Sequence, residues 1–260
     1  MKLGLIGGGN IGKFLLQSIN SDKLVDGAQF VGLYTRNQEK ANELAEEYDL
    51  RSYQSIDELI ASDIDVIVEA ATVEVVRAHA TSVLTHGKDL VVSSVGAFSD
   101  NDYFLQLETI CKEQGTTIHL PSGAVGGLDI LKAAKAIGAL QEVSLTTTKP
   151  PHALNGVTLE NKTVLFEGNA YEAIKQFPKN INVSIILSLA GLGSKETKVK
   201  IIADPKATKN SHEITAKGAF GKVKLVVEND PMPNNPKTSY LAALSVLSTL
   251  KHKDQSIKVG

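Results

Sequence analysis

Gly7-Gly8-Gly9-Asn10-Ile11-Gly12 follows the short apolar run Lys2–Ile6 and opens a stretch with helical spacing over Ile11–Ile19. The glycines repeat as Gly-x-Gly-x-x-Gly. In this pattern Gly7 makes a tight turn, Gly9 lets backbone N–H groups approach a pyrophosphate, and Gly12 lets the helix pack closely on the strand. The helix N-terminus adds unpaired N–H donors and the positive end of its dipole. We therefore predict a strand–turn–helix unit that binds a dinucleotide through Gly7, Gly9, Asn10, Ile11 and Gly12.

The residues around this unit alternate short β-branched runs with amphipathic segments, which is the pattern of parallel βαβ units. The runs expected as strands are Lys2–Ile6, Phe30–Tyr34, Asp65–Ala70, Leu90–Ser94 and Thr116–Leu120. The helices expected between them are Ile11–Ile19, Gln38–Tyr48, a short helix opened by Ser55 and running through Ala61, Val73–Thr85 and Asp102–Gln114. The first half therefore predicts a doubly wound parallel sheet of the Rossmann type.

Beyond Pro121 the pattern changes to longer strands with alternating polarity. In Lys222–Glu228, for example, Val223, Leu225 and Val227 share one face, as expected for a sheet with one wet side. The other strands expected here are Glu142–Thr148, Thr197–Ala203 and His212–Lys217, and the helices are Gly126–Ile137, Asn182–Leu192 and Thr238–Leu250. We predict an α/β protein in which residues 1–124 with 237–260 form the dinucleotide-binding domain. Residues 125–236 form a second, α+β domain with a mixed or antiparallel sheet.

Composition excludes several classes of protein. With 27 Lys+Arg against 29 Asp+Glu, the formal charge of −2 provides no electrostatic footprint for nucleic acid or an acidic membrane. The single cysteine cannot form an intramolecular disulfide, and the chain has neither His-Glu-x-x-His nor Cys-x-x-Cys, so no metal site is expected. The apolar run at the N-terminus is too short for an export signal, and the uncharged stretch 180–194 is too short for a membrane span. We expect a soluble, cytoplasmic protein.

The choice between NAD and NADP is read at the end of the second strand, where an acidic residue usually binds the ribose 2′-hydroxyl of NAD. This chain reads Tyr34-Thr35-Arg36-Asn37 there. Arg36 can pair with a 2′-phosphate, so we expect NAD or NADP, with NADP accepted at least as well. Ala70–Thr72 and Ser94–Ala97 follow strands at the carboxyl edge of the sheet, where ligands bind, and their small residues leave space for a nicotinamide ribose.

Three of the six histidines are candidates for proton transfer: His119, His152 and His212. The other three, His79, His86 and His252, are expected at the surface. A histidine at a strand edge beside a cleft can act as a general acid or base near neutral pH. Spacing alone leaves His119 and His212 as nearly equal alternatives.

Five segments together resemble the L-aspartate dehydrogenase family. They occur in the family's order and span nearly the whole chain: Gly-Leu-Ile-Gly-Gly-Gly-Asn-Ile-Gly at 4–12, Pro-Ser-Gly-Ala-Val-Gly-Gly-Leu-Asp at 121–129, Phe-Pro-Lys-Asn-Ile-Asn-Val at 177–183, Asn-Ser-His-Glu-Ile at 210–214 and Asn-Pro-Lys-Thr-Ser-Tyr at 235–240. The resemblance implies that His212 is the catalytic residue and that Ala124 and Asn182 contact the cofactor. It also implies a homodimer built through the sheet of the second domain.

The activity implied by the resemblance is NAD(P)-dependent oxidation of L-aspartate to iminoaspartate, with hydrolysis to oxaloacetate and ammonia, feeding NAD biosynthesis. Lys149, Lys237 and the backbone N–H groups of 122–127 are candidates for binding the two substrate carboxylates. The alternatives are a related two-domain reductase of the dihydrodipicolinate reductase or homoserine dehydrogenase type, and a non-catalytic redox sensor that binds NAD(P).

Overall fold

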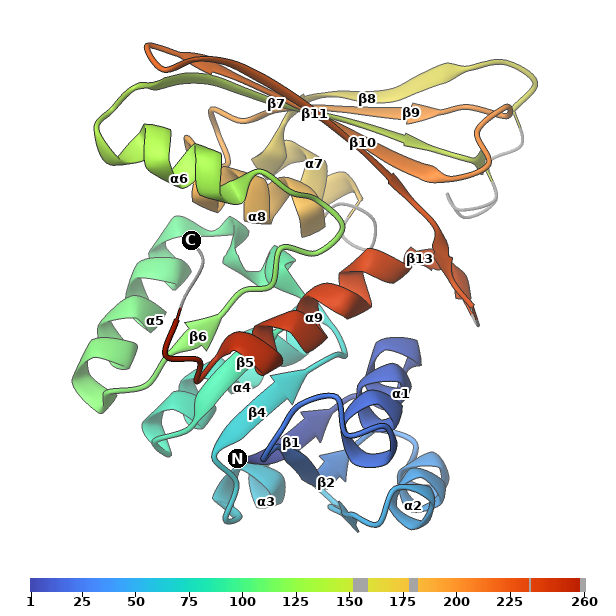
Figure 1. Ribbon diagram of the computed structural model, residues 1–260, viewed down its shortest axis with the longest axis vertical. Coiled ribbons are helices and arrows are strands. Elements are labelled where there is room, and N and C mark those ends of the chain that lie inside the picture. Colours follow the sequence, from blue (N-terminus) through green and yellow to red (C-terminus); the bar gives the residue numbers. More distant parts are fainter. Residues whose placement is uncertain (152–158, 178–181, 234, 258–260) are drawn as a thin grey trace. The chain divides into compact units, whose positions relative to one another are not determined.

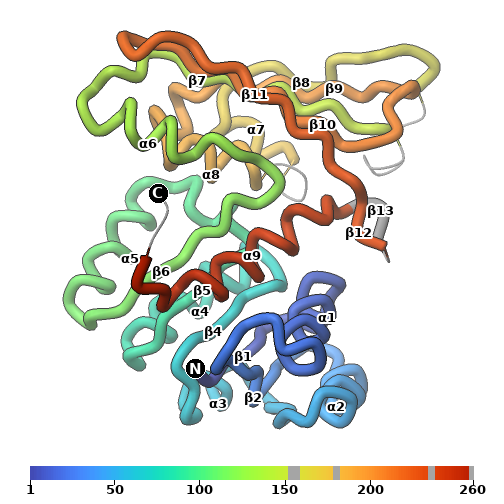
Figure 2. The backbone as a smooth tube through the Cα atoms, in the orientation of Figure 1, coloured from blue at the N-terminus to red at the C-terminus, as the bar shows by residue number. Residues whose placement is uncertain are grey.

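The computed structural model describes residues 1–151, 159–177, 182–233 and 235–257, with the side chains of 235–237 left out. The chain forms two compact units, one of Met1–Pro121 with Ala243–Val259 and one of Ser122–Ala242. In Figure 2, the first unit consists of the blue-to-green first part of the chain together with most of the red C-terminal helix. Within the described part of the chain, no helix is both long and apolar enough to cross a membrane.

The first unit is built on a six-stranded sheet with the strand order β3-β2-β1-β4-β5-β6, in which every neighbouring pair is parallel. The order reverses between β1 and β4, as in a doubly wound fold. The strands are β1 Lys2–Ile6, β2 Gln29–Tyr34, β3 Arg51–Ser52, β4 Val66–Glu69, β5 Asp89–Val92 and β6 Ile118–His119. The predicted Rossmann-type parallel sheet is therefore confirmed.

Helices connect these strands, and most begin at a side chain that caps the first turn. The side chains of Asn37, Ser55, Thr72 and Asp100 each accept a backbone N–H at a helix start. The helical elements are α1 Asn10–Leu16 continuing into the π-turn Gln17–Ser21, α2 Gln38–Glu47, α3 Ile56–Ala61, α4 Val73–Thr85, the 3₁₀ turn Val95–Ser99, α5 Asn101–Gln114 and α9 Tyr240–His252. Figure 1 shows α4 and α5 side by side next to β4, β5 and β6.

The core of the first unit joins both ends of the chain. Leu3 and Leu5 of β1 are fully buried, since a central parallel strand is covered on both faces. Val246, Leu247 and Leu250 of α9 belong to the same buried cluster. The C-terminal helix is thus part of the core of the first unit.

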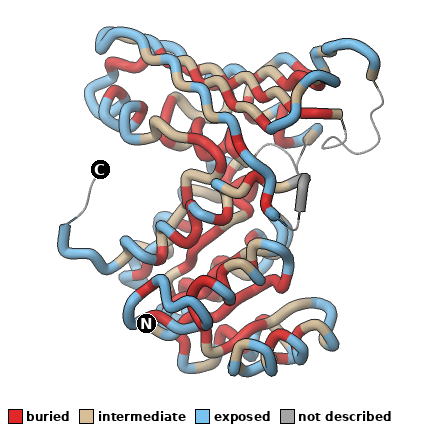
Figure 3. The backbone as a smooth tube through the Cα atoms, turned by 45° about the vertical axis from the view of Figure 1, so that its right-hand side comes forward, coloured by how far each residue is buried: buried red, intermediate tan, exposed pale blue. Residues whose placement is uncertain are grey.

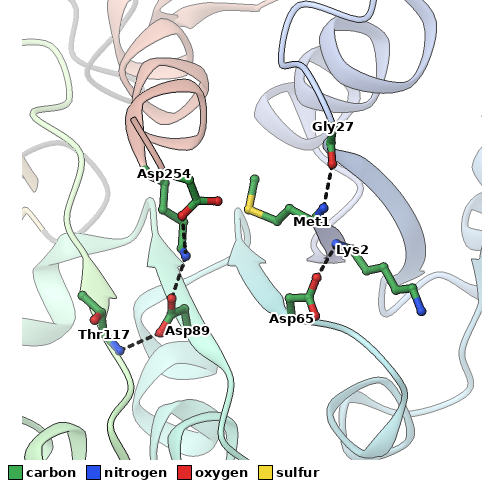
Figure 4. A network of polar contacts seen from close by, with 8 residues as sticks. Met1, Lys2, Gly27, Asp65, Asp89, Thr117 and Asp254 are labelled. Atoms are coloured by element: carbon green, nitrogen blue, oxygen red, sulfur yellow. Dashed lines mark hydrogen bonds and ion pairs between the residues drawn. The ribbon is translucent and has the colours of Figure 1, made fainter. Parts of the chain in front are cut away.

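Polar contacts hold the amino ends of the strands and the end of α9 together (Figure 4). The Asp65 carboxylate accepts the Lys2 backbone N–H at 2.7 Å, which joins β1 to the residue preceding β4. The Asp89 carboxylate accepts the Thr117 N–H at 2.7 Å and pairs with the Lys253 ammonium at 2.8 Å. These contacts lie at the edge of the sheet opposite the glycine turn.

The second unit contains a five-stranded mixed sheet with the order β11-β10-β7-β9-β8, in which β7 and β9 are parallel and the other pairs antiparallel. Helices α6, α7 and α8 lie on one face of this sheet (Figure 1). The elements are β7 Leu140–Lys149, β8 Thr163–Asn169, β9 Lys198–Ala203, β10 Asn210–Gly218, β11 Gly221–Asn229, the small ribbon β12 Pro231–Met232 with β13 Asn235–Ser239, and α6 Leu128–Ala136, α7 Ala170–Gln176 and α8 Asn182–Ala190. The predicted mixed sheet is confirmed.

Burial alternates along the strands of this sheet, as Figure 3 shows in red and blue. Val223, Leu225 and Val227 of β11 are half-buried, while Lys222, Lys224 and Glu228 are exposed. The prediction of one wet face is therefore confirmed. Exposed ion pairs cross between strands on that face: Lys217–Glu142, Lys224–Glu213 and Lys200–Glu167.

The sequence patterns missed the strands β3, β8, β12 and β13 and helix α7, and they placed several element ends a few residues away from those in the structure. Strand β8 lies at the sheet edge and buries Phe166 alone, so its pattern of alternation is weak. Helix α7 opens with a capping box between Asn169 and Glu172, a signal that the sequence contained. The last helix was predicted to start at Thr238, but Thr238 belongs to β13 and α9 begins at Tyr240.

Candidate functional site

The glycine turn after β1 is shaped by backbone atoms that leave no space for side chains. Gly7 has φ +112° and donates its N–H to the Tyr34 carbonyl at 2.9 Å. A Cβ on Gly7 would overlap the Ala70 carbonyl, and a Cβ on Gly12 would overlap the carbonyl of Gly7. Two of the three motif glycines are therefore required by contacts within the fold itself.

Gly9 is different, because its surroundings are open. No atom lies within 4 Å of a Cβ built on Gly9, and Gly9 and Asn10 are both exposed. Gly9 is also the N-cap of α1 and provides no side chain to cap the helix. No side chain therefore caps the first N–H groups of α1, which include that of the half-buried Ile11. This open helix start fits a pyrophosphate group, which needs N–H donors and free space.

The end of β2 lies against the same turn. A Cβ on Gly8 would approach the Thr35 methyl group at 3.4 Å. Arg36 follows in an exposed bend, before Asn37 caps α2. Arg36 is therefore one residue away from a side chain that touches the glycine turn, where the 2′ position of a bound ribose is expected.

A buried carboxylate at the end of β4 was missed by the sequence analysis. Glu69 is 1% exposed and accepts N–H or O–H bonds from Ala71 and Ser94. These partners belong to the two segments of small residues already expected at the carboxyl edge. A glutamate that ends an otherwise apolar strand, Val66-Ile67-Val68-Glu69, was the available signal.

His212 lies on β10 of the second unit and is 3% exposed. Its Nδ1 is 3.0 Å from the hydroxyl of Thr147, the residue directly opposite on β7, which is fully buried. Burial, together with the charge of Lys149, lowers the pKa of His212 to about 3. The imidazole is therefore neutral at pH 7, with one ring nitrogen held by Thr147.

Further polar side chains lie on the same face of the sheet, near His212. Lys149 is two residues along β7 from Thr147, and burial lowers the pKa of its ammonium to about 8. Asn210 is two residues before His212 and faces Asn229 across β10 and β11. Both asparagines are buried, and their Oδ1 atoms have no hydrogen-bond partner in the described part of the chain. This end of an otherwise apolar face therefore combines a base, a cation and two free acceptors.

Ala124 and Asn182 belong to the second unit too. The Ala124 carbonyl accepts the Asn229 side-chain N–H at 3.1 Å, which joins the segment 122–127 to the end of β11. Asn182 is the first residue of α8, and its neighbour Val183 lies 3.8 Å from a Cβ built on Gly123. Ala124 thus contacts Asn229, and the preceding residue, Gly123, lies against the start of α8.

The other candidate residues lie elsewhere. His119 is half-buried on β6 of the first unit, so it belongs to a different unit from His212. His86 and His252 are exposed, whereas His79 is half-buried and lies 3.7 Å from Asp57. His152 and the side chain of Lys237 lie outside the described residues. Among the described residues, no group of three or more His, Cys, Asp or Glu side chains is arranged to hold a metal ion.

Comparison with known proteins identifies the family. The chain is 42% identical to an L-aspartate dehydrogenase of Methanococcus maripaludis and 39% identical to one of Methanocaldococcus jannaschii, covering 100% of this chain and 99% of each relative. The chain belongs to the aspartate dehydrogenase family. A model of the aspartate dehydrogenase C-terminal region matches residues 129–253, and a model of the homoserine dehydrogenase NAD-binding domain matches residues 7–121.

Solved structures agree with this assignment to the aspartate dehydrogenase family. The crystal structure of an aspartate dehydrogenase from Thermotoga maritima superposes with a TM-score of 0.80 at 30% identity, covering 100% of this chain and 99% of the other. A scyllo-inositol dehydrogenase from Lactobacillus casei, at 11% identity and a TM-score of 0.60, shares the fold alone. The resemblance drawn from five sequence segments is thus confirmed.

Proposed function

We propose that this chain is an NAD(P)-dependent L-aspartate dehydrogenase. It oxidises L-aspartate at Cα to iminoaspartate, which is hydrolysed to oxaloacetate and ammonia. The observation that carries this proposal is the alignment with L-aspartate dehydrogenases over the full length of the chain at 42% identity. The homoserine dehydrogenase alternative finds support only in residues 7–121, the cofactor-binding part that many dehydrogenases share.

The two parts of the chain divide the work in this proposal. Residues 1–124 with 237–260 bind the dinucleotide, whose pyrophosphate is received by the open helix start at Gly9, Asn10 and Ile11. Gly7 and Gly12 shape the turn that presents these groups. Residues 125–236 bind the substrate. Ala124, the last residue of the first range but part of the second compact unit, and Asn182 contribute cofactor contacts.

A bound oxidised nicotinamide supplies the acceptor for the hydride that leaves Cα. His212 manages the accompanying proton: it accepts one from the substrate ammonium group or from the water that attacks the imine, and donates it in the reverse direction. The hydroxyl of Thr147 at Nδ1 orients the ring and leaves Nε2 for this transfer. Lys149 supplies positive charge for a substrate carboxylate, and the free Oδ1 atoms of Asn210 and Asn229 are acceptors suited to an ammonium group.

Turnover tests this function directly. Formation or loss of reduced cofactor is followed by absorbance with L-aspartate, D-aspartate, L-homoserine, and oxaloacetate plus ammonia. We expect activity with L-aspartate and with oxaloacetate plus ammonia. Activity with L-homoserine alone would identify the protein as a reductase of the homoserine dehydrogenase type. Tight cofactor binding without any turnover would favour the redox sensor.

For the cofactor, we propose that NADP is accepted at least as well as NAD. The support is the absence of an acidic residue in Tyr34-Thr35-Arg36-Asn37 and the exposed position of Arg36 beside the glycine turn. Arg36→Ala is expected to lower kcat/KM for NADP about 5- to 30-fold and to change that for NAD less than twofold, because a charge-assisted hydrogen bond to the 2′-phosphate is lost. A strong preference for NAD that persists in Arg36→Ala would contradict the proposal.

Three further features of the proposal concern the biosynthetic role, the location and the oligomeric state of the protein. The product iminoaspartate suits a role in NAD biosynthesis, and the location expected from the sequence, the cytoplasm, stays a prediction. We also propose a homodimer through the sheet of the second unit. Support comes from the face of this sheet opposite α6, α7 and α8, which no described helix covers (Figure 1). Light scattering of the purified protein would detect the dimer.

A further inference from the structure

Glu69 is the only aspartate or glutamate among the described residues that is buried. Burial raises the pKa of its carboxyl, while hydrogen bonds from Ser94 and Ala71 oppose that shift. No ion pair to Glu69 is found within the described residues. Burying a carboxylate without a cation costs free energy. We therefore expect its hydrogen bonds to fix a local backbone conformation that an apolar side chain could not fix.

The carboxylate joins two loops. Its Oε1 accepts the Ala71 N–H at 2.7 Å and the Ser94 hydroxyl at 2.8 Å, and its Oε2 accepts the Ser94 N–H at 2.9 Å. Ala71 follows β4, and Ser94 follows β5. One side chain therefore sets the path of the chain after both strands, using short charge-assisted bonds to the backbone.

The loop after β4 in turn touches the glycine turn. The Ala70 carbonyl occupies the space that a Cβ on Gly7 would need, and the Ala70 N–H donates to the Ile6 carbonyl at 2.8 Å. Because Ala70 lies between Glu69 and Ala71, the bond to the Ala71 N–H restrains the peptide that packs against Gly7. The loops after β1, β4 and β5 are thus joined through Glu69.

These loops lie where a dinucleotide is expected to bind. The strand order reverses between β1 and β4, and open α/β sheets bind ligands outside the carboxyl ends of the strands at that reversal. Glu69 is the last residue of β4, so it is located at the reversal itself. A stabilising role alone would not require a carboxylate at this particular edge.

We propose that Glu69 is a positioning residue of the cofactor site, which holds the loops 70–72 and 93–97 in the shape that receives the nicotinamide end of the dinucleotide. This inference rests on the proposed function for the identity of the cofactor. It does not depend on which substrate the enzyme oxidises.

Two substitutions separate the bonds that Glu69 makes. Glu69→Gln keeps the oxygen that accepts the Ala71 N–H and the Ser94 hydroxyl but places an amide N–H₂ against the Ser94 N–H, so the backbone bond to the loop after β5 is replaced by a contact between two donors. Ser94→Ala removes the hydroxyl bond alone. Asn20→Ala is the matched control, because Asn20 is also buried and makes three hydrogen bonds, to Phe30 and Tyr48, at the opposite edge of the same sheet.

The measurements are the direct Kd for NADP and NADPH by titration calorimetry, the KM for L-aspartate, and the Tm. We expect Glu69→Gln to raise the cofactor Kd about 10- to 100-fold, as expected for losing a hydrogen bond to a charged group, and to change the KM for L-aspartate less than threefold. Ser94→Ala should raise Kd about 3- to 10-fold. Asn20→Ala should lower the Tm by a similar amount and leave Kd within twofold.

A Kd for Glu69→Gln no higher than that for Asn20→Ala at an equal loss of Tm would overturn the inference. If Glu69→Gln does not fold, Ser94→Ala decides: an unchanged Kd in that variant also overturns it. If the wild-type protein binds cofactor but does not oxidise L-aspartate, the proposed function fails while the binding measurements still test Glu69.

Discussion

His212 shows how one residue can be specified by its neighbours on adjacent strands. The side chain is buried, its Nδ1 is held by Thr147, and Lys149 adds a positive charge nearby. Burial and the charge of Lys149 disfavour the imidazolium form, so the ring is neutral at pH 7. In the proposed function, the two carboxylates of L-aspartate would bring negative charge to this face and make proton uptake by the ring easier.

Replacing His212 by alanine is expected to lower kcat by about 10²- to 10⁴-fold, the range for loss of a general acid–base group, while the cofactor Kd stays within threefold. Steady-state rates with L-aspartate and calorimetric titration of the cofactor measure the two quantities. His119→Ala, at the other candidate histidine, is the control and should retain nearly normal kcat. Near-normal turnover of the His212 variant with a defective His119 variant would reverse the assignment.

His212 also makes stability depend on pH. Its pKa is about 3 in the folded state against 6.5 in the unfolded chain, so the unfolded chain takes up a proton first as the pH falls. The contribution of His212 to the free energy of unfolding is fully present above pH 6.5. It is lost as the pH falls from 6.5 to 3, and the loss is at most about 5 kcal/mol. Urea unfolding at pH 7, 5.5 and 4.5 should show a smaller loss in His212→Asn, and parallel losses in both proteins would contradict this expectation.

At the scale of the element, the glycines of the turn after β1 differ in role: some are required for folding and one leaves space for binding. Gly12 and Gly7 are constrained by backbone contacts, whereas Gly9 has a Cβ position that is empty and an ordinary φ of −74°. The three glycines of one motif therefore have different physical roles. Matched alanine substitutions can distinguish them.

Gly12→Ala is expected to destabilise the protein by about 3 kcal/mol or more, because its Cβ overlaps the Gly7 carbonyl. Gly9→Ala should change stability by no more than about 0.5 kcal/mol, since no atom obstructs the new methyl group. It should still raise the cofactor Kd at least tenfold by filling the space where the pyrophosphate approaches. Urea unfolding and cofactor titration measure both quantities in each variant. An unchanged cofactor Kd in Gly9→Ala would mean that the pyrophosphate does not bind at this turn.

At the scale of the whole molecule, the chain leaves the first unit near Pro121 and returns to it in α9. The returning helix contributes Val246, Leu247 and Leu250 to the core around β1. The Lys253–Asp89 ion pair then fixes the end of that helix near the start of β5 (Figure 4). The cofactor-binding unit is therefore complete only when the C-terminal segment is present.

Leu250→Ala is expected to lower the free energy of unfolding by about 2–5 kcal/mol, because Leu250 is 1% exposed and its removal leaves a cavity. Leu244 lies on the same helix but is 37% exposed, so Leu244→Ala should cost under about 1 kcal/mol. Denaturant unfolding of both variants gives the comparison. Equal losses would mean that the helix is held by something other than its packing into this core.

Much of the local structure was predictable because its causes are local. Strand Lys2–Ile6 and helix Val73–Thr85 were predicted to the residue, since the apolar run of the strand stops at Gly7 and Gly87 after His86 closes the helix. Strand β8 was missed because an edge strand buries little and shows weak alternation. Helix α9 starts late because Thr238 and Ser239 belong to β13, where Ser239 pairs with Pro231, and spacing does not reveal this tertiary pairing.

The sequence by itself determined the class of the fold, the glycine turn and the family, because these depend on short segments whose residues act on their immediate neighbours. Only the tertiary structure decided which polar groups meet. Thr147 and His212 are 65 residues apart and meet across two strands, and Glu69 reaches Ser94 across 25 residues. Burial and hydrogen bonding between distant strands set the charge and orientation of both side chains, and neither effect is encoded in the spacing of residues along the chain.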